Sequence, residues 1–172
     1  FGLLTQKPML IVVNVDENQY LNGSYPKKDE LEAMAKEFNY PLVVVCGKLE
    51  MELLQLSEPE QKLFMEDLGL TEPGIDRIAR SIYKMLGLIS FFTVGSDEVR
   101  AWTIRTGENA KEAAGTIHSD ISRGFIRAEV VAYSDFIKTG SELKAKEAGV
   151  YRLEGKDYLV QDGDIINFRF NV

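Results

Sequence analysis

The fold of the first half of the chain is decided by residues 8–15, PMLIVVNV, and residues 41–46, PLVVVC. Each is a short, continuous apolar run rich in β-branched residues, which is typical of a strand buried on both faces of a parallel sheet. Residues 27–38 lie between them, and their apolar positions recur at helical spacing, which predicts a helix with one buried face. A strand, a helix and a strand in this order predict a βαβ unit with a right-handed crossover.

Two or three further helices are predicted before the middle of the chain. Residues 49–56 carry a helical stripe of apolar side chains. Ser57, followed by a proline and two glutamates, is typical of a helix start, and this helix is expected to end near Gly69. A second start signal at residues 71–73 opens another helix, which Gly87 is expected to end.

After Gly87 the periodicity changes from helical to strand-like, which places a boundary between an α/β unit at residues 1–87 and a second unit at residues 88–172. The second unit has the predicted order β-β-α-β-β-β, which indicates an α+β, ubiquitin-like β-grasp module. The predicted segments are strands at 88–95, 99–107 and 125–133, two strands within 157–170 around an Asp-Gly-Asp turn, a helix at 108–118, a turn at 95–97, and a loop or short helix at 134–150.

Composition excludes several classes of protein. One cysteine and one histidine in 172 residues exclude an internal disulfide and leave too few ligands for most zinc sites. The net charge is −7, with −5 from residues 1–87 and −2 from residues 88–172. The chain as a whole therefore lacks the excess of positive charge that is typical of nucleic-acid-binding proteins, and DNA is not an expected partner. No apolar run is long enough for a bilayer and no secretion signal opens the chain, so we expect a cytoplasmic protein with no membrane partner.

The first candidate site is the loop Asn14-Val15-Asp16-Glu17, at the carboxyl end of the first predicted strand, where open α/β sheets bind ligands. It resembles the guanine-reading pattern N-K-x-D, with Val15 in place of lysine and Glu17 in place of aspartate. Glu17 is one methylene too long for the forked contact with guanine, and adenine has no 2-amino group. The loop therefore favours a relaxed or adenine-preferring purine pocket, in which Glu17 turns aside towards solvent or a loop amide. A polar loop without a ligand also fits this short pattern.

The second candidate site is Cys46-Gly47-Lys48, at the end of the second predicted strand. Its place matches the loop that closes over the base in Ras-like domains, and Gly47 would let the backbone approach a purine closely. An ordinary loop with a small buried thiol at Cys46 is the alternative, and no activating partner marks that thiol as a nucleophile.

Motifs for phosphate chemistry are missing from the 172 residues. Neither G-x-x-x-x-G-K-[S/T] nor a D-x-x-G loop before the first strand occurs, so this chain alone is not expected to transfer phosphoryl groups, and we assign no catalytic residue and no metal ligand. His118 has carboxylates nearby in sequence, and we expect it to make a helix-end hydrogen bond instead of acting as a base.

The second half resembles the TGS module of the YchF/Obg-like ATPase family. The resemblance is carried by IHSD at 117–120, GFIRAEV at 124–130, DYLVQDGDI at 157–165 and FRFNV at 168–172. The first half is also similar, because NVDE at 14–17 stands where the family has its N-x-x-E base-reading motif. The resemblance covers essentially the whole chain, but only the C-terminal part of the family protein.

The resemblance implies a Ras-like P-loop NTPase that prefers ATP to GTP, hydrolyses it with magnesium, and binds ribosomes. By similarity, Asn14 and Glu17 are base-side residues, the Val15 backbone contacts the purine, and Cys46-Gly47 replaces the family's usual Ser-Ala or Ser-Gly. Neither nucleotide nor magnesium is expected to stay bound to this chain alone. Candidate contacts to ribosomal RNA are Arg100, Arg105, Arg123, Arg127 and Arg152. The alternative is a non-catalytic RNA- or ribosome-binding module without nucleotide affinity.

Overall fold

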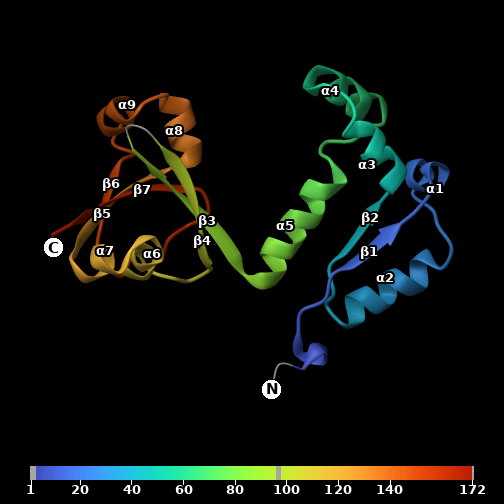
Figure 1. Cartoon of the computed structure of the whole chain (residues 1–172), viewed down its shortest axis with the longest axis horizontal. Coiled ribbons are helices and arrows are strands. Elements are labelled where there is room, and N and C mark those ends of the chain that lie inside the picture. The colour runs from blue at the N-terminus through green and yellow to red at the C-terminus, as the bar shows by residue number, and fades with distance from the viewer. Residues whose placement is uncertain (1–2, 96–97, 172) are drawn as a thin grey trace. The chain divides into compact units, whose positions relative to one another are not determined.

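The computed structural model describes residues 3–95 and 98–171. The chain divides into two compact units, Phe1–Leu86 and Gly87–Val172 (Figure 1). The predicted turn at 95–97 falls partly outside the described residues. No helix in the described ranges is long and apolar enough to cross a membrane.

The first unit contains the predicted βαβ arrangement. Strands β1 (Ile11–Asn14) and β2 (Leu42–Val45) are parallel and in continuous register, and helix α2 (Lys28–Glu37) connects them (Figure 1). β1 begins three residues later than predicted, because the first hydrogen bond of the ladder runs from the Ile11 amide to the Pro41 carbonyl. The two strands therefore end side by side, at Asn14 and Val45.

The helices predicted for the first unit are present, and the structure contains one further helix that the sequence did not predict. Helix α3 spans Gly47–Leu53, α4 spans Glu58–Asp67 and α5 spans Gly74–Leu86. A short 3-10 turn at Leu4–Gln6 precedes β1. Ser57 and Glu60 form a capping box that starts α4, as the sequence signal predicted. Helix α1 (Glu17–Asn22) is the addition, and it begins because Asp16 and Gln19 cap each other reciprocally.

The second unit is built on a five-stranded mixed sheet in the order β4-β3-β7-β5-β6. Its central strand β7 (Asp164–Phe170) lies parallel to β3 and antiparallel to β5. The other strands are β3 (Leu88–Val94), β4 (Val99–Arg105), β5 (Phe125–Ala132) and β6 (Arg152–Glu154).

One prediction for the second unit is wrong, and another, a loop or short helix at 134–150, is made more exact by the structure. The strand expected from residue 157 is not formed, and the edge strand β6 lies earlier, at Arg152–Glu154. Residues 158–160 instead pair with the segment where the helix at Ala110–Ile117 begins. The Ala110 amide donates to the Tyr158 carbonyl, and the Val160 amide donates to the Glu108 carbonyl. The segment 134–150 contains two short helices, α8 (Tyr133–Thr139) and α9 (Glu142–Glu147), separated by Gly140 in the left-handed region. The predicted helix is α6 (Ala110–Ile117), and α7 (Ser119–Arg123) follows it.

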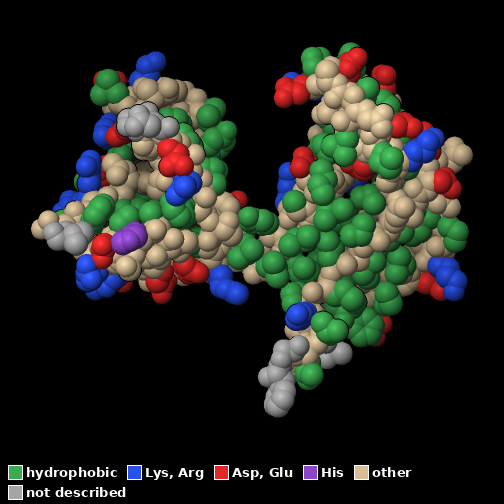
Figure 2. All heavy atoms as spheres, in the orientation of Figure 1, with side chains coloured by type: hydrophobic (Ala, Val, Ile, Leu, Met, Phe, Trp, Pro, Cys, Tyr) green, Lys and Arg blue, Asp and Glu red, His purple; other side chains and the backbone are tan. Residues whose placement is uncertain are grey.

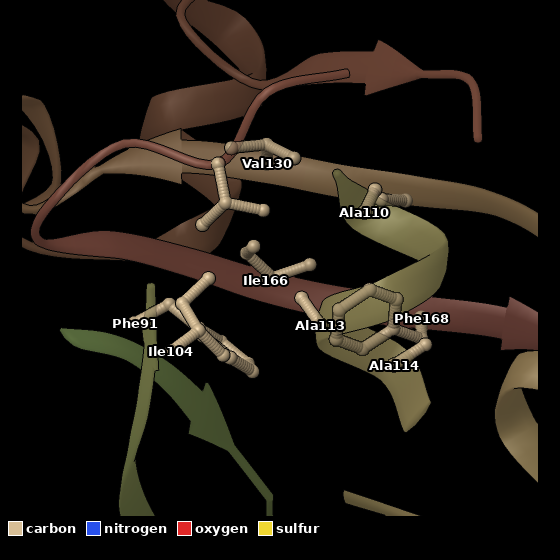
Figure 3. Packing of buried hydrophobic residues seen from close by; sticks show 10 residues of the cluster. Phe91, Ile104, Ala110, Ala113, Ala114, Val130, Ile166 and Phe168 are labelled. Atoms are coloured by element: carbon tan, nitrogen blue, oxygen red, sulfur yellow. The ribbon is translucent and has the colours of Figure 1, made fainter. Parts of the chain in front are cut away.

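The core of the second unit lies between the sheet and α6. Ala110, Ala113 and Ala114 are fully buried, because small side chains let the helix approach the sheet closely. Figure 3 shows these alanines facing Ile166 and Phe168, which project from β7. The Phe168 ring also meets the Phe91 and Phe125 rings edge-on, at centroid distances of 6.0 and 6.1 Å.

Candidate functional site

The carboxyl ends of β1 and β2 are joined by hydrogen bonds between the two predicted loops. The Asn14 side-chain oxygen Oδ1 accepts a bond from the Gly47 amide at 2.9 Å. The Val15 amide donates to the Val45 carbonyl, also at 2.9 Å. This bond joins two loops that lie 33 residues apart in the sequence.

Position 47 leaves little room for a side chain. A Cβ placed on Gly47 would lie 3.3 Å from Asn14 Oδ1, which is the atom that the Gly47 amide binds. Cys46, which precedes the helix α3, is 2% exposed and behaves as the small buried thiol that the sequence suggested. The backbone, and not the thiol, is therefore what this loop presents.

The Glu17 side chain is partly exposed to solvent and pairs with a lysine, and not with a loop amide. Its Oε2 atom lies 2.8 Å from the Nζ atom of Lys48, which also lies 3.9 Å from the Glu52 carboxylate. The hydrogen bond that the Lys48 ammonium donates to the Glu17 carboxylate is the main cause of the raised pKa of Lys48. The ion pair links the two strand-end loops on the solvent side, with the Lys48 side chain 68% and the Glu17 side chain 42% exposed.

Arg77 supports this end of the sheet and was not singled out from the sequence. One of its Nη atoms donates to the Tyr20 hydroxyl and to the Val44 carbonyl, both at 2.8 Å, and the guanidinium lies 5.8 Å from the centre of the Tyr20 ring. It lines a cavity of about 260 Å³ with Tyr20, Tyr25 and Val44. Arg77 thus ties α1, which carries Glu17, to β2. In the sequence, Arg77 stands among the polar positions of α5, between Ile75 and Ile78, so no local signal distinguished it from a solvent-exposed side chain.

The structure also describes the surroundings of potential metal ligands and of His118. No three carboxylate, histidine or cysteine side chains of residues 3–95 and 98–171 are grouped to hold a metal ion. The prediction for His118 is confirmed, because its Nδ1 accepts a hydrogen bond from the Asp120 amide at 3.2 Å and caps α7.

The five arginines predicted as RNA contacts do not form one surface. Arg100 pairs with Glu98 and lies over the Trp102 ring at 5.2 Å, on β4. Arg123 pairs with Asp120 at 2.6 Å on α7. Arg152 on the edge strand β6 bonds the Tyr158 hydroxyl at 3.1 Å and lies 3.8 Å from the buried Asp164 carboxylate. Two exposed arginines have no ion-pair partner in the described part of the chain: Arg105 and Arg127.

Arg169, which sequence reasoning missed, lies directly opposite Arg127 in the pairing of β5 with β7. Its guanidinium donates to both oxygens of Glu129, at 2.9 and 3.1 Å. These bonds are the main reason that the pKa of Glu129 lies below its usual range. The alternation of polar and apolar residues in the last strand was the signal that could have placed Arg169 on this face.

Comparison with known proteins gives a consistent result. Residues 88–171 match the family model YchF-GTPase_C, described as "Protein of unknown function (DUF933)". The chain is 49% identical over 174 residues to the "Ribosome-binding ATPase YchF" of Bacillus subtilis, covering 99% of this chain and 47% of the relative. It is 46% identical to the protein of the same name from Escherichia coli O157:H7, with the same coverage of both chains. The chain therefore spans about half the length of the curated relatives it matches.

Solved structures agree with these relatives. The YchF GTPase of Schizosaccharomyces pombe superposes with a TM-score of 0.85 at 32% identity, over 97% of this chain and 44% of that one. A GTP binding protein of Pyrococcus horikoshii superposes with a TM-score of 0.65 at 18% identity, over 96% of this chain and 46% of that one, which shows a shared fold alone.

Proposed function

Since this chain belongs to the YchF family, we propose that it supplies the purine-base side of a nucleotide site and a ribosome-binding unit to a translation-associated, cytoplasmic ATPase. The observation that carries the nucleotide part is the bond between Asn14 and Gly47, which joins the two strand-end loops into one surface. The ribosome part follows from the relatives, which are named ribosome-binding ATPases.

The fold of each unit fits this proposal in its finer detail. The first unit is the remnant of a Ras-like domain, and the second is a TGS module of the β-grasp type. Parallel sheets are normally covered on both faces. Among the described residues β1 pairs with β2 alone, and Figure 2 shows hydrophobic side chains gathered over β1, β2 and α5. Further strands of a larger domain would cover such a surface.

The site favours adenine over guanine. A guanine-reading carboxylate must be free to accept from two donors of the base, and Glu17 is held by Lys48 instead. The purine is then read by backbone groups near Val15 and Gly47, which do not require a 2-amino group. ATP, with magnesium bound through its phosphates, is the expected nucleotide of the whole site.

The test of base preference is the ratio of the ATP and GTP dissociation constants for a full-length protein that contains this chain and for its Glu17→Asp variant. Aspartate is shorter, so it leaves Lys48 and faces the base, and preference moves towards GTP by about 1–3 kcal/mol. A ratio unchanged within about twofold, or ~0.4 kcal/mol, shows that Glu17 does not set the preference.

Hydrolysis is proposed to need parts that these 172 residues do not carry. The chain is expected to show no ATP turnover above buffer, because the phosphate-binding and magnesium-binding motifs are not in its sequence. Magnesium-dependent turnover by a clean sample would contradict this.

The alternative function is a non-catalytic ribosome- or RNA-binding module. It is favoured by the Lys48–Glu17 pair, which already satisfies the carboxylate at the base side. Co-sedimentation with ribosomes, combined with no measurable ATP or GTP binding by this chain or by a full-length relative, would select it.

A further inference from the structure

One face of the sheet in the second unit presents two arginines side by side. Ala128 and Phe168 pair across β5 and β7 and are buried in the core. Arg127 and Arg169 pair one position away, so they point to the opposite face. Both side chains are exposed, and directly opposite residues have Cβ atoms about 4.5–5.5 Å apart.

Two like charges at such a distance destabilise a strand pair unless an opposite charge balances them. Glu129 balances one of them, because its carboxylate accepts both bonds from Arg169 and is only 14% exposed. Arg127 has no ion-pair partner among residues 3–95 and 98–171. The cluster of Arg127, Arg169 and Glu129 therefore keeps one positive charge in a chain whose net charge is −7.

Phosphate is the ligand that fits this cluster. A guanidinium binds phosphate oxygens with two parallel hydrogen bonds, and Arg127 has its whole fork available. Glu129 holds Arg169 in a fixed position next to it, which reduces the entropy lost on binding.

The Tyr151 ring, which contacts this cluster, is already engaged. The Tyr151 hydroxyl lies 3.2 Å from both Glu129 and Glu142, and the Lys146 ammonium lies 4.6 Å from its ring centre. This ring is therefore not free to stack on an unpaired base, and recognition runs through the phosphate backbone.

We propose that the exposed face around Arg127 and Arg169 is the RNA contact of the second unit, and that it binds the phosphate backbone of RNA without regard to base sequence. This inference rests on the proposed ribosome binding. It narrows the proposed contact surface from five candidate arginines to the pair Arg127 and Arg169, and it leaves out Arg100, Arg105, Arg123 and Arg152.

The experiment measures binding of a fluorescently labelled RNA duplex by anisotropy, over about 50 to 200 mM salt. Each lost phosphate contact lowers the slope of log K against log salt by about one. We expect a decrease of about one for Arg127→Gln and about two for Arg127→Gln with Arg169→Gln. Arg169→Lys keeps the charge and the slope but weakens binding. Circular dichroism and thermal unfolding establish that each variant is folded, and Arg127→Gln disturbs no ion pair.

The matched control is Lys111→Gln, which removes an exposed positive charge from α6, on the other side of the sheet. Its slope should equal that of the unchanged chain.

Ribosome co-sedimentation of the same proteins separates the two proposals. One outcome is that the chain binds ribosomes while the Arg127→Gln and double variants show the same salt dependence of RNA binding as the unchanged chain. That result would overturn the assignment of the RNA contact to the arginine pair and leave the proposed ribosome binding intact. If poly-glutamate competes as well as RNA, the partner is an acidic protein and the inference also falls. If the unchanged chain binds neither ribosomes nor RNA, the proposed function itself fails.

Discussion

The two units bury their apolar side chains to very different degrees. In the second unit Phe91 is fully buried and Ile166 is 1% exposed, between a five-stranded sheet and α6. In the first unit a two-stranded sheet leaves Val12 44% exposed, and Phe38 at the end of α2 is 55% exposed. A βαβ unit with two strands has too few neighbours to cover both faces of its sheet. The first unit therefore combines a smaller buried set, which includes Leu49 and Leu53, with polar ties such as Asn14 to Gly47, while the second is held mainly by packing.

The largest expected effect tests this difference in packing. Phe91→Ala should lower the free energy of unfolding by about 3–5 kcal/mol, because it leaves a cavity at a fully buried position. Phe38→Ala, the matched change in the first unit, should cost less than about 1 kcal/mol, because this ring is mostly in solvent. Urea unfolding of both variants measures the two costs. Equal costs would show that the first unit is packed as tightly as the second.

A glycine in the second unit gives the next effect. A Cβ on Gly124 would overlap the Asn171 carbonyl oxygen, and the Gly124 carbonyl accepts a bond from the Asn171 amide. Gly124→Ala should therefore cost about 1–3 kcal/mol through overpacking. Gly155→Ala is the control, since a Cβ there meets nothing within 4 Å and should change stability by less than about 1 kcal/mol. Thermal unfolding compares them, and similar melting temperatures would show that the last strand is not held tightly against this turn.

The sequence predicted those elements whose signals are local. The buried runs at β1 and β2 gave a parallel pair, and the Ser57 signal gave the start of α4, because side-chain periodicity and capping act within a few residues. The strand expected from residue 157 failed for the opposite reason. Its apolar residues pair with the loop before α6, which is a partner far away in sequence.

The candidate site shows the same division. Asn14 and Gly47 were found because each ends a predicted strand, and parallel strands end at one edge of a sheet. The partner of Glu17 was missed because Lys48 lies 31 residues away, and a side chain's partner depends on the register of the strands. The arginines were chosen by charge alone, which does not tell the two faces of a strand apart until the pairing of β5 with β7 is known.

Ion pairs provide a third test of the comparison. Arg169→Gln should lower the stability of the chain at neutral pH, because it removes two bonds to the mostly buried Glu129 carboxylate. The pKa of Glu129 is lowered in the folded chain, so this contribution is present above the ordinary glutamate pKa of about 4.3 and is lost as pH falls through the lower, folded pKa. The difference between the two proteins should therefore shrink below about pH 4 in urea unfolding.

Arg100→Gln, which breaks an exposed pair with Glu98, is the control and should show little cost at either pH. A cost for Arg169→Gln that does not change with pH would mean that packing, and not charge, is lost.

The smallest effect belongs to the ion pair of the first unit. Lys48 and Glu17 are as close as Arg169 and Glu129, at 2.8 Å compared with 2.9 Å, but the Glu17 side chain is 42% exposed and the Glu129 side chain 14%. Water competes for an exposed pair, so Lys48→Met should destabilise the chain less than Arg169→Gln does, and about 1 M salt should remove most of its effect. Urea unfolding with and without salt measures it. A cost as large as that of Arg169→Gln would break the comparison, because it would show that exposure does not set the value of these pairs.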